Sequence, residues 1–242
     1  MTRPGDLWRG FAGLRVIADV HGDAHAFEHA VEGALAEDMF VLQLGDLTDH
    51  GPDSPAVLRR MFALIDQGRG LFLLGNHDHK LRRALTGVPI RVQPEGLGRT
   101  LEQLDAAPDG AALKARAVEE IARAPAWIRD GGRVFVHGGF HPGMMHTDPP
   151  PDAGAGKATG LVTRALYGQV TGRMREDGFP ERVHDWVDRI PPDVTVVCGH
   201  DRRSVNGRPF VAENAQGGKA IFLDCGAAKG GHLAWMDMPA WA

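Results

Sequence analysis

The chain has 242 residues, of which 43% are hydrophobic and 24% are charged, as is ordinary for a globular protein. Its formal net charge is −4, so the chain lacks the excess of basic residues that tight nucleic-acid binding requires. The end of a nucleic acid stays open as a substrate. No apolar run approaches the ~20 residues of a membrane span, and residues 1–13 contain no apolar signal segment. We therefore expect a cytoplasmic protein with one domain over residues 1–242 and two buried, reduced thiols, Cys198 and Cys225.

Short apolar runs along the chain predict buried strands. They lie at 14–18, 40–44, 71–74, 133–136 and 195–198, with three more at 209–212, 220–223 and 232–236. Helical spacing of apolar residues covers 24–36 and a second segment that begins at Ser54. There, Ser54 is predicted to cap a helix that has Pro55 at its first position.

The region from about 86 to 130 differs because it has no apolar strand run. Within it, 97–107 and 111–124 are predicted to be two helices of an inserted cap. A further helical stretch is expected over 160–189. The segment 146–159 contains three consecutive prolines and several glycines, so we predict a mobile loop or lid there.

Side chains that can bind metals follow five of the predicted strands, and a glycine adjoins each group. They are Asp19 and His21, then Asp46, then Asn76 and His77, then His137, and finally His200. In open α/β sheets, ligands bind beyond the carboxyl ends of the strands, where the loops converge on one crevice. The repeated pattern therefore predicts a single site built from all five strand ends.

The predicted ligands are carboxylate, amide and imidazole groups, a mixture that suits Mn, Fe or Zn better than Ca. Six protein ligands are too many for one catalytic ion, because such an ion must keep an open position. They suit two ions that share a bridging carboxylate. Two ions about 3.5–4 Å apart form the clamp used for in-line displacement at phosphorus.

These segments resemble the signature of the calcineurin-like metallophosphoesterases, in the branch that includes bacterial Ser/Thr phosphatases and symmetrical diadenosine tetraphosphatases. The matching segments are DVHG at 19–22, GDLTDHGPDS at 45–54, GNHD at 75–78, HGG at 137–139 and GH at 199–200. The flanks at 75–85, 165–172 and 222–236 are similar to the phosphatase domain of bacterial polynucleotide kinase-phosphatases. The resemblance covers nearly the whole chain in order.

The resemblance implies an α/β fold, a four-layer sandwich of two mixed sheets flanked by helices, with the helical insertion at about 86–130. It also implies hydrolysis of phosphate esters by in-line attack of a hydroxide that bridges two divalent ions, with Mn favoured and Fe or Zn as alternatives. The resemblance further implies that Asp19 and His21 hold the first ion and that Asp46 bridges both ions. The second ion is held by Asn76, His137 and His200, and Asn76 also binds phosphate. In the same scheme His77 is the general acid, and Asp49 orients it.

One position departs from the family pattern, since His50 stands where the family has an arginine that binds phosphate. An imidazole has fewer donors than a guanidinium and is only partly charged at neutral pH, which predicts a weaker grip on dianionic monoesters. Arg173 is a candidate second phosphate-binding arginine, and a surface position is its alternative. Lys80, Arg82 and Arg83 form either a solvated helix face or a funnel for anions. Asp224 is either a turn residue or an outer group of the metal site.

The substrate stays open at this stage among a phosphoprotein, a dinucleoside polyphosphate, a nucleic-acid 3′-phosphate or cyclic phosphate, and a small metabolite. The flanking similarity favours a nucleotide-like substrate. An alternative to an enzyme is a metal-binding scaffold of the same fold, which only His50 favours. The sequence gives no indication of oligomeric state.

Overall fold

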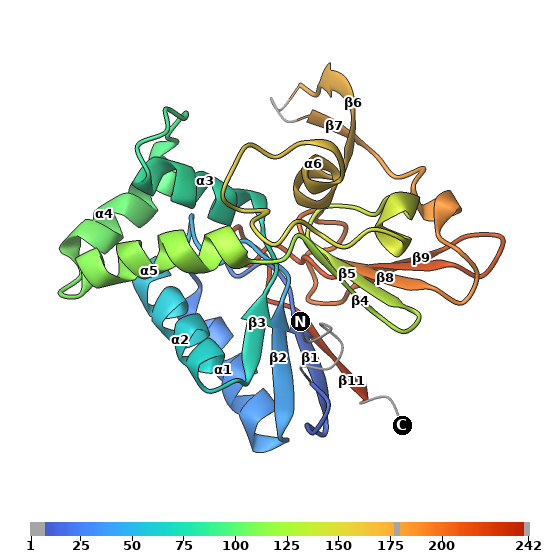
Figure 1. The fold of residues 1–242 in the computed structure, drawn as a ribbon, viewed down its shortest axis with the longest axis horizontal. Coiled ribbons are helices and arrows are strands. Elements are labelled where there is room, and N and C mark those ends of the chain that lie inside the picture. The colour runs from blue at the N-terminus through green and yellow to red at the C-terminus, as the bar shows by residue number, and fades with distance from the viewer. Residues whose placement is uncertain (1–7, 177–179, 240–242) are drawn as a thin grey trace.

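A computed structural model describes residues 8–176 and 180–239, and its strands form two mixed sheets and one hairpin (Figure 1). The first sheet has the order β11 (Trp235–Pro239), β1 (Gly13–Ile17), β2 (Met39–Gln43) and β3 (Gly70–Phe72). The second has the order β4 (Trp127–Asp130), β5 (Arg133–Val136), β8 (Thr195–Cys198), β10 (Lys219–Phe222) and β9 (Phe210–Glu213). All eight strands predicted from apolar runs are confirmed.

Each sheet contains three parallel strands, with one antiparallel edge strand in the first sheet and two in the second. In the first sheet β1, β2 and β3 are parallel, and β11 runs against β1. In the second sheet β5, β8 and β10 are parallel, and β4 and β9 are antiparallel to their neighbours. The carboxyl ends of three parallel strands therefore lie together in each sheet.

Alternation along β1 shows how the layers are stacked. Leu14 and Val16 belong to a buried cluster that also contains Phe135 and Val197 of the second sheet, so these side chains fill the space between the sheets. Ile17 belongs instead to the larger cluster, which includes buried residues of the helices on the outer face. The predicted four-layer sandwich is confirmed.

Helices cover the outer faces of the two sheets (Figure 1). The larger group consists of α1 (Ala24–Ala36), α2 (Ser54–Asp66), α3 (Asn76–Leu85), α4 (Arg99–Ala106) and α5 (Gly110–Arg123), with a π turn at Pro94–Gly98 before α4. On the other side lie α6 (Gly160–Tyr167) and the 3₁₀ turns Pro142–Met145 and Val187–Arg189. The N-cap of α2 is Asp53, whose carboxylate accepts from the Ala56 amide, and not Ser54 as predicted.

The helical insertion is confirmed as α4 and α5, but it also ends in a strand that the sequence did not predict. Residues 127–130 form β4, which pairs with β5 at the edge of the second sheet. Buried Leu113, Ala117 and Ile121 of α5 join the main core, so this helix is part of the helical layer. The apolar run was missed because β4 is short and ends in Arg129 and Asp130.

The helical prediction over 160–189 is wrong beyond Tyr167. The chain turns at Gly168, which has φ +67°, and then forms the hairpin of β6 (Gln169–Met174) and β7 (Pro180–Val183). Residues 177–179 of this stretch lie outside the described residues. Residues 170–174 of β6 are exposed whether they are polar or apolar, so no alternation of buried apolar residues indicated a strand.

The proline-rich segment 146–159 contains no helix or strand, as predicted, but it is tied to α3. The carbonyl of Gly156 accepts from His79 Nε2 at 2.7 Å, and that of Ala155 accepts from Arg82 Nη1 at 2.6 Å. These bonds hold the segment against the helical layer, which does not fit a free lid.

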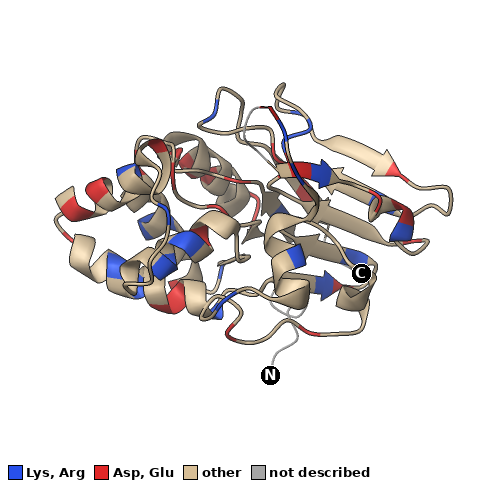
Figure 2. Cartoon of the chain, turned by 90° about the horizontal axis from the view of Figure 1, so that it is seen from above, with Lys and Arg blue, Asp and Glu red and all other residues tan. Residues whose placement is uncertain are grey.

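The distribution of surface charge and the state of the two cysteines agree with the expectations from the sequence. Basic and acidic segments are interspersed along the helical layer in Figure 2, without one basic face in that view. Among the described residues no helix combines the length and the apolar character needed to cross a membrane. Cys198 and Cys225 are free and buried. The first seven residues of the N-terminal segment considered above lie outside the described residues.

Candidate metal centre

The predicted ligands come from strand ends in both sheets, and the structure brings them together. Asp19 accepts from the backbone amide of His200 through both carboxylate oxygens, at 2.9 and 3.1 Å. His137 Nδ1 lies 2.9 Å from the carbonyl oxygen of Leu44, at the end of β2. Contacts across the two sheets therefore join four strand ends directly, as the repeated pattern predicted.

Two glycines permit this close approach. A Cβ on Gly75 would lie 2.3 Å from both the backbone nitrogen and Oδ1 of Asp46. A Cβ on Gly199 would lie 2.2 Å from Oδ1 of Asp19. Since real Cβ atoms do not approach that closely, any side chain at either position would displace a predicted metal ligand.

The ligand atoms form two groups that share one residue. Asp19, His21 and Asp46 offer atoms within 4.8 Å of one another, and so do Asp46, His137 and His200. Asn76 lies beside the second group, because its Oδ1 is 3.1 Å from His137 Nε2. Asp46 Oδ2 lies between the groups, 3.8 Å from His21 Nε2 and 3.4 Å from His137 Nε2. This arrangement fits two ions with one bridging carboxylate.

Outer hydrogen bonds aim two imidazoles at the centre. His21 Nδ1 donates to the Thr48 carbonyl at 3.0 Å, as His137 Nδ1 does to Leu44, because a carbonyl oxygen can only accept. Each ring therefore presents an unprotonated Nε2 lone pair to the carboxylates when it is neutral. Such outer partners fix the tautomer and orientation of metal-binding histidines.

The pKa shifts of the buried carboxylates and of His137 are also those expected at a site for a cation. Burial and the neighbouring charge of Asp224 raise the pKa of Asp19 well above its usual range. Burial also favours neutral Asp46, but His137 and His77 outweigh it and hold the pKa of Asp46 well below its usual range. Against burial, Asp46 and Asp19 raise the pKa of His137 to about 9. A proton on His137 thus compensates for carboxylates that divalent ions would neutralise. Asp224 is buried and acts on Asp19, which favours the outer-group interpretation.

His77 and Asp49 form the predicted acid pair, and a third residue supports them. His77 Nδ1 lies 2.5 Å from Asp49 Oδ2, and its Nε2 lies 3.9 Å from Asp46 Oδ2. Thr100 of α4 donates its hydroxyl to Asp49 Oδ1 at 2.9 Å and accepts from the Asp49 amide at 3.0 Å. The insertion therefore supplies a residue that fixes Asp49, a contact that no local sequence pattern indicated.

Asp78 is a second supporting residue that sequence reasoning passed over. Its carboxylate accepts from the amides of Asp46, Leu47 and Gly75 at 2.7, 3.0 and 3.0 Å. Burial, followed by the charge of Asp46, raises the pKa of Asp78 to about 6. It joins the start of α3 to the loop after β2, and its place in the GNHD segment was the available signal.

Backbone strain is concentrated at this site. Eight described non-glycine residues have positive φ, and five of them are predicted site residues: His21, Asp46, Asp49, His50 and His200. Such conformations cost about 1–3 kcal/mol each and persist only where the surroundings enforce them. The hydrogen bonds to Asp46 and Asp49 are part of that enforcement.

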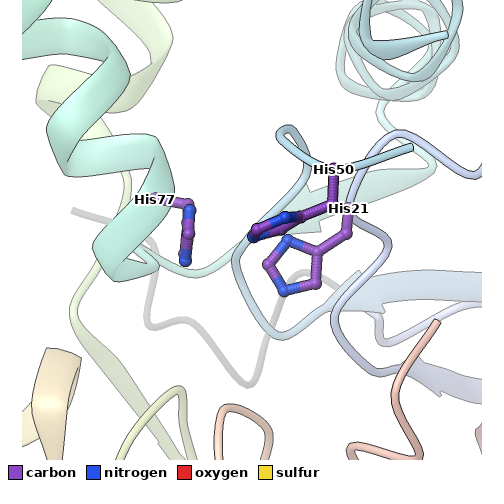
Figure 3. A group of neighbouring side chains, drawn as sticks. All are labelled: His21, His50 and His77. Atoms are coloured by element: carbon purple, nitrogen blue, oxygen red, sulfur yellow. The ribbon is translucent and has the colours of Figure 1, made fainter. Parts of the chain in front are cut away.

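Three imidazoles line the same side of the site (Figure 3). The rings of His21, His50 and His77 meet edge to face, with centroids 4.9–5.4 Å apart. His50 comes from the loop before α2, and His77 comes from the first turn of α3. Burial, followed by the charge of Lys229, lowers the pKa of His50 to about 4, so this ring is neutral at pH 7.

Lys229 enters the site from the loop after β10. Its Nζ lies 2.7 Å from His21 Nε2, and as an ammonium it donates to that nitrogen. Burial and the charge of Lys229 hold the pKa of His21 well below its usual range. The lysine follows a strand end by seven residues, too far for the strand-end pattern to include it.

The predicted arginine does not join this group. Arg173 lies on β6 with an exposed side chain, and no described contact connects it to the ligand atoms. Arg182 of β7 is better placed, because its charge acts on His200 and Asp201. Its Nη1 donates to the Tyr167 carbonyl at 3.1 Å, which ties the hairpin to the end of α6.

A pocket of about 180 Å³ opens beside the acid pair. It is lined by Asp49, His77, Lys80, Arg91, Gln93 and Leu97. Lys80 thus faces a pocket next to His77, whereas Arg82 is bonded to backbone carbonyls of neighbouring segments. The anion interpretation of the basic cluster is favoured for Lys80, with Arg91 as a partner from the insertion.

The sequence profile of the calcineurin-like phosphoesterases matches residues 14–204, which include every predicted metal ligand. The chain belongs to this family. It is 30% identical over 199 residues to a bis(5′-nucleosyl)-tetraphosphatase PrpE [asymmetrical] from Geobacillus thermodenitrificans, covering 81% of this chain and 74% of the relative. It is 27% identical to the protein of the same name from Anoxybacillus flavithermus, covering 93% and 89%.

The fold is also shared with a solved serine/threonine phosphatase from Saccharomyces cerevisiae. The TM-score is 0.56 at 14% identity, with 96% of this chain and 81% of the other covered. Family membership makes this chain a phosphoester hydrolase whose fold implies divalent metal ions. The scaffold alternative therefore loses its support.

Proposed function

We propose that this protein hydrolyses dinucleoside polyphosphates with two divalent ions that share Asp46. The observation that carries this proposal is the pair of ligand groups with Asp46 in common, placed directly beside the His77–Asp49 pair. Asp19, His21 and Asp46 would hold one ion, and Asp46, Asn76, His137 and His200 the other. Bound ions supply an activated water and Lewis-acid stabilisation of phosphate charge.

The side chains of the protein then position the substrate and protonate the leaving oxygen. Water attacks phosphorus in line and releases one proton to solvent, the bond from phosphorus to the leaving oxygen breaks, and His77 gives its Nε2 proton to that oxygen. Asp49 accepts from Nδ1 of the same ring and orients it. Thr100 keeps Asp49 in place from α4. Asn76 holds a phosphate oxygen from its position beside His137.

The substrate class rests on two independent supports. Relatives over most of this chain's length are named bis(5′-nucleosyl)-tetraphosphatases. In addition, Lys80 and Arg91 line the pocket beside His77, where a leaving group departs. A leaving nucleotide carries several phosphate charges, and two cations beside the general acid suit it better than a neutral alcohol.

Manganese is our proposed ion, with iron or zinc as alternatives, because carboxylate, amide and imidazole donors are combined at one site. The protein should be stripped of metal, loaded with each ion in turn, and incubated with diadenosine tetraphosphate. Chromatography of the products then separates asymmetrical cleavage into AMP and ATP from symmetrical cleavage into two ADP.

We expect turnover with Mn²⁺ and asymmetrical products. His77→Asn should lower kcat by about 10²–10⁴-fold while diadenosine tetraphosphate still binds, because only proton donation is removed. His146→Asn is the matched control, since His146 is an exposed residue that follows the 3₁₀ turn Pro142–Met145. Turnover of p-nitrophenyl phosphate without turnover of diadenosine tetraphosphate would overturn the substrate class. An absence of turnover of both with Mn²⁺, Fe²⁺ and Zn²⁺ would overturn the function.

A further inference from the structure

The Lys229 side chain brings an amino group to the side of the site where the family arginine is missing. The residue is exposed overall, but its stem carries Nζ inward to 2.7 Å from His21 Nε2. Its charge acts on His50 as well as on His21. The ammonium therefore faces the two imidazoles that a phosphate on the first ion must approach.

The loop that carries Lys229 is fixed, whereas its side chain is not. Gly226 and Ala228 have φ of +81° and +55°, which fold the segment sharply. The Lys229 amide donates to the Gly226 carbonyl, and its own carbonyl accepts from Arg202 Nη1, both at 3.0 Å. Within the described residues the one hydrogen bond of Nζ is the one to His21, so a turn of the exposed side chain would carry this head group from His21 to a ligand.

His50 cannot fill the same role. Its ring packs edge to face against those of His21 and His77, and its Cε1 and Nε2 lie on the side of Gly96. An imidazole offers at most two donors, whereas the guanidinium it replaces offers five in a fixed fork. The charge that grips phosphate must therefore come from another residue on this side of the site.

We propose that Lys229 is the phosphate-binding cation of this protein, replacing from the C-terminal loop the arginine that His50 displaced. This inference rests on the proposed function. With His21 holding an ion, Nζ would leave Nε2 and would bind a non-bridging oxygen of the phosphate. Because an ammonium is a point charge on a flexible stem, it selects for phosphate charge more than for the geometry of two oxygens.

The test measures phosphate binding directly. Inorganic phosphate is titrated calorimetrically into the Mn-loaded protein, and KM and kcat for diadenosine tetraphosphate are measured in parallel. Lys229→Gln should weaken phosphate binding by about tenfold or more, as expected for a lost charge-assisted hydrogen bond. KM should rise with it while kcat changes less. Lys229→Arg should retain most of the affinity. Lys219→Gln is the matched control, since Lys219 pairs with Glu213 at the start of β10, and the site lies beyond the carboxyl ends of the strands.

A double variant tests whether a cation at position 50 can replace the cation at position 229. His50→Arg in the Lys229→Gln background should recover phosphate affinity, because it returns a cation to the same side of the first ion. The affinity for Mn²⁺, titrated without phosphate, should stay the same or increase in Lys229→Gln, since a cation beside His21 is removed.

Three outcomes would overturn the proposal. Unchanged phosphate affinity in Lys229→Gln would show that Nζ does not touch phosphate. Loss of Mn²⁺ affinity in the same variant would show that Lys229 acts through the metal site. Failure of His50→Arg to restore binding would show that the two positions do not exchange. If wild-type protein bound no phosphate and hydrolysed nothing, the proposed function itself would fail instead.

Discussion

The two sides of the site are built in different ways. On the metal side, most of the predicted ligands are buried at the ends of parallel strands, and His21, Asp46 and His200 have positive φ. On the substrate side, Lys229 and Arg91 reach in from loops and are exposed, with Lys80 on the first turns of α3. We therefore expect the sandwich itself to fix the metal ligands, and residues that can change without disturbing it to determine the choice of substrate.

The strongest test of the metal side is removal of the shared carboxylate charge. Asp46→Asn should lower turnover of diadenosine tetraphosphate by about 10³-fold or more, because the contribution of a catalytic ion is several kcal/mol. Asp105→Asn is the control, since Asp105 is exposed and pairs with Lys114 on the surface. Mn²⁺ titration should show at least one ion lost in Asp46→Asn only. Two ions bound by this variant would contradict the bridging role.

Proton binding gives a second test, on stability. The folded pKa of His137, about 9, lies above its ordinary value of 6.5, so its protonation stabilises the metal-free fold fully below pH 6.5, and this contribution is lost as pH rises through 9. Metal-free protein should lose on the order of 3 kcal/mol of unfolding free energy between pH 6.5 and 9.5. Urea unfolding in EDTA measures this loss.

Saturation with Mn²⁺ provides the control for that pH dependence. A bound ion takes the place of the proton on His137, so the same pH interval should no longer lower stability. Equal pH dependence with and without metal would mean that His137 does not bind the ion.

Close backbone approach provides a third test of the metal side. Gly75→Ala should lower kcat by about 10²-fold, since its Cβ would lie 2.3 Å from Asp46 and displace both this ligand and the start of α3. Gly156→Ala is the control, because nothing lies within 4 Å of a Cβ there. Wild-type kinetics in Gly75→Ala would show that the ligand cluster tolerates displacement.

These features also show what the sequence could and could not predict. The strand ends carrying Asp19, Asp46 and His137 were predictable, because an apolar run followed by glycine and a ligand is a local pattern. The hairpin after Gly168 was not, since β6 is exposed on most of its length. Lys229 and Thr100 reach the site through tertiary contacts across 208 and 51 residues. No spacing rule indicates such contacts.

The smallest expected effect lies at the boundary between the two sides. Thr100→Val keeps the shape of the side chain but removes the hydroxyl that bonds Asp49. Turnover should fall by about tenfold, the worth of one hydrogen bond to a charged group, with KM nearly unchanged. Thr86→Val, at the exposed end of α3, should leave turnover as it is. An unaltered kcat in Thr100→Val would mean that the helical insertion does not contribute to catalysis through Asp49.

The central claim is tested most directly by the number of Mn²⁺ ions bound at saturation. This number is measured by equilibrium titration of metal-free wild-type protein, followed by metal analysis of the saturated protein. We expect two ions per chain in the wild type. One ion or none would contradict a centre in which Asp46 joins two metal sites.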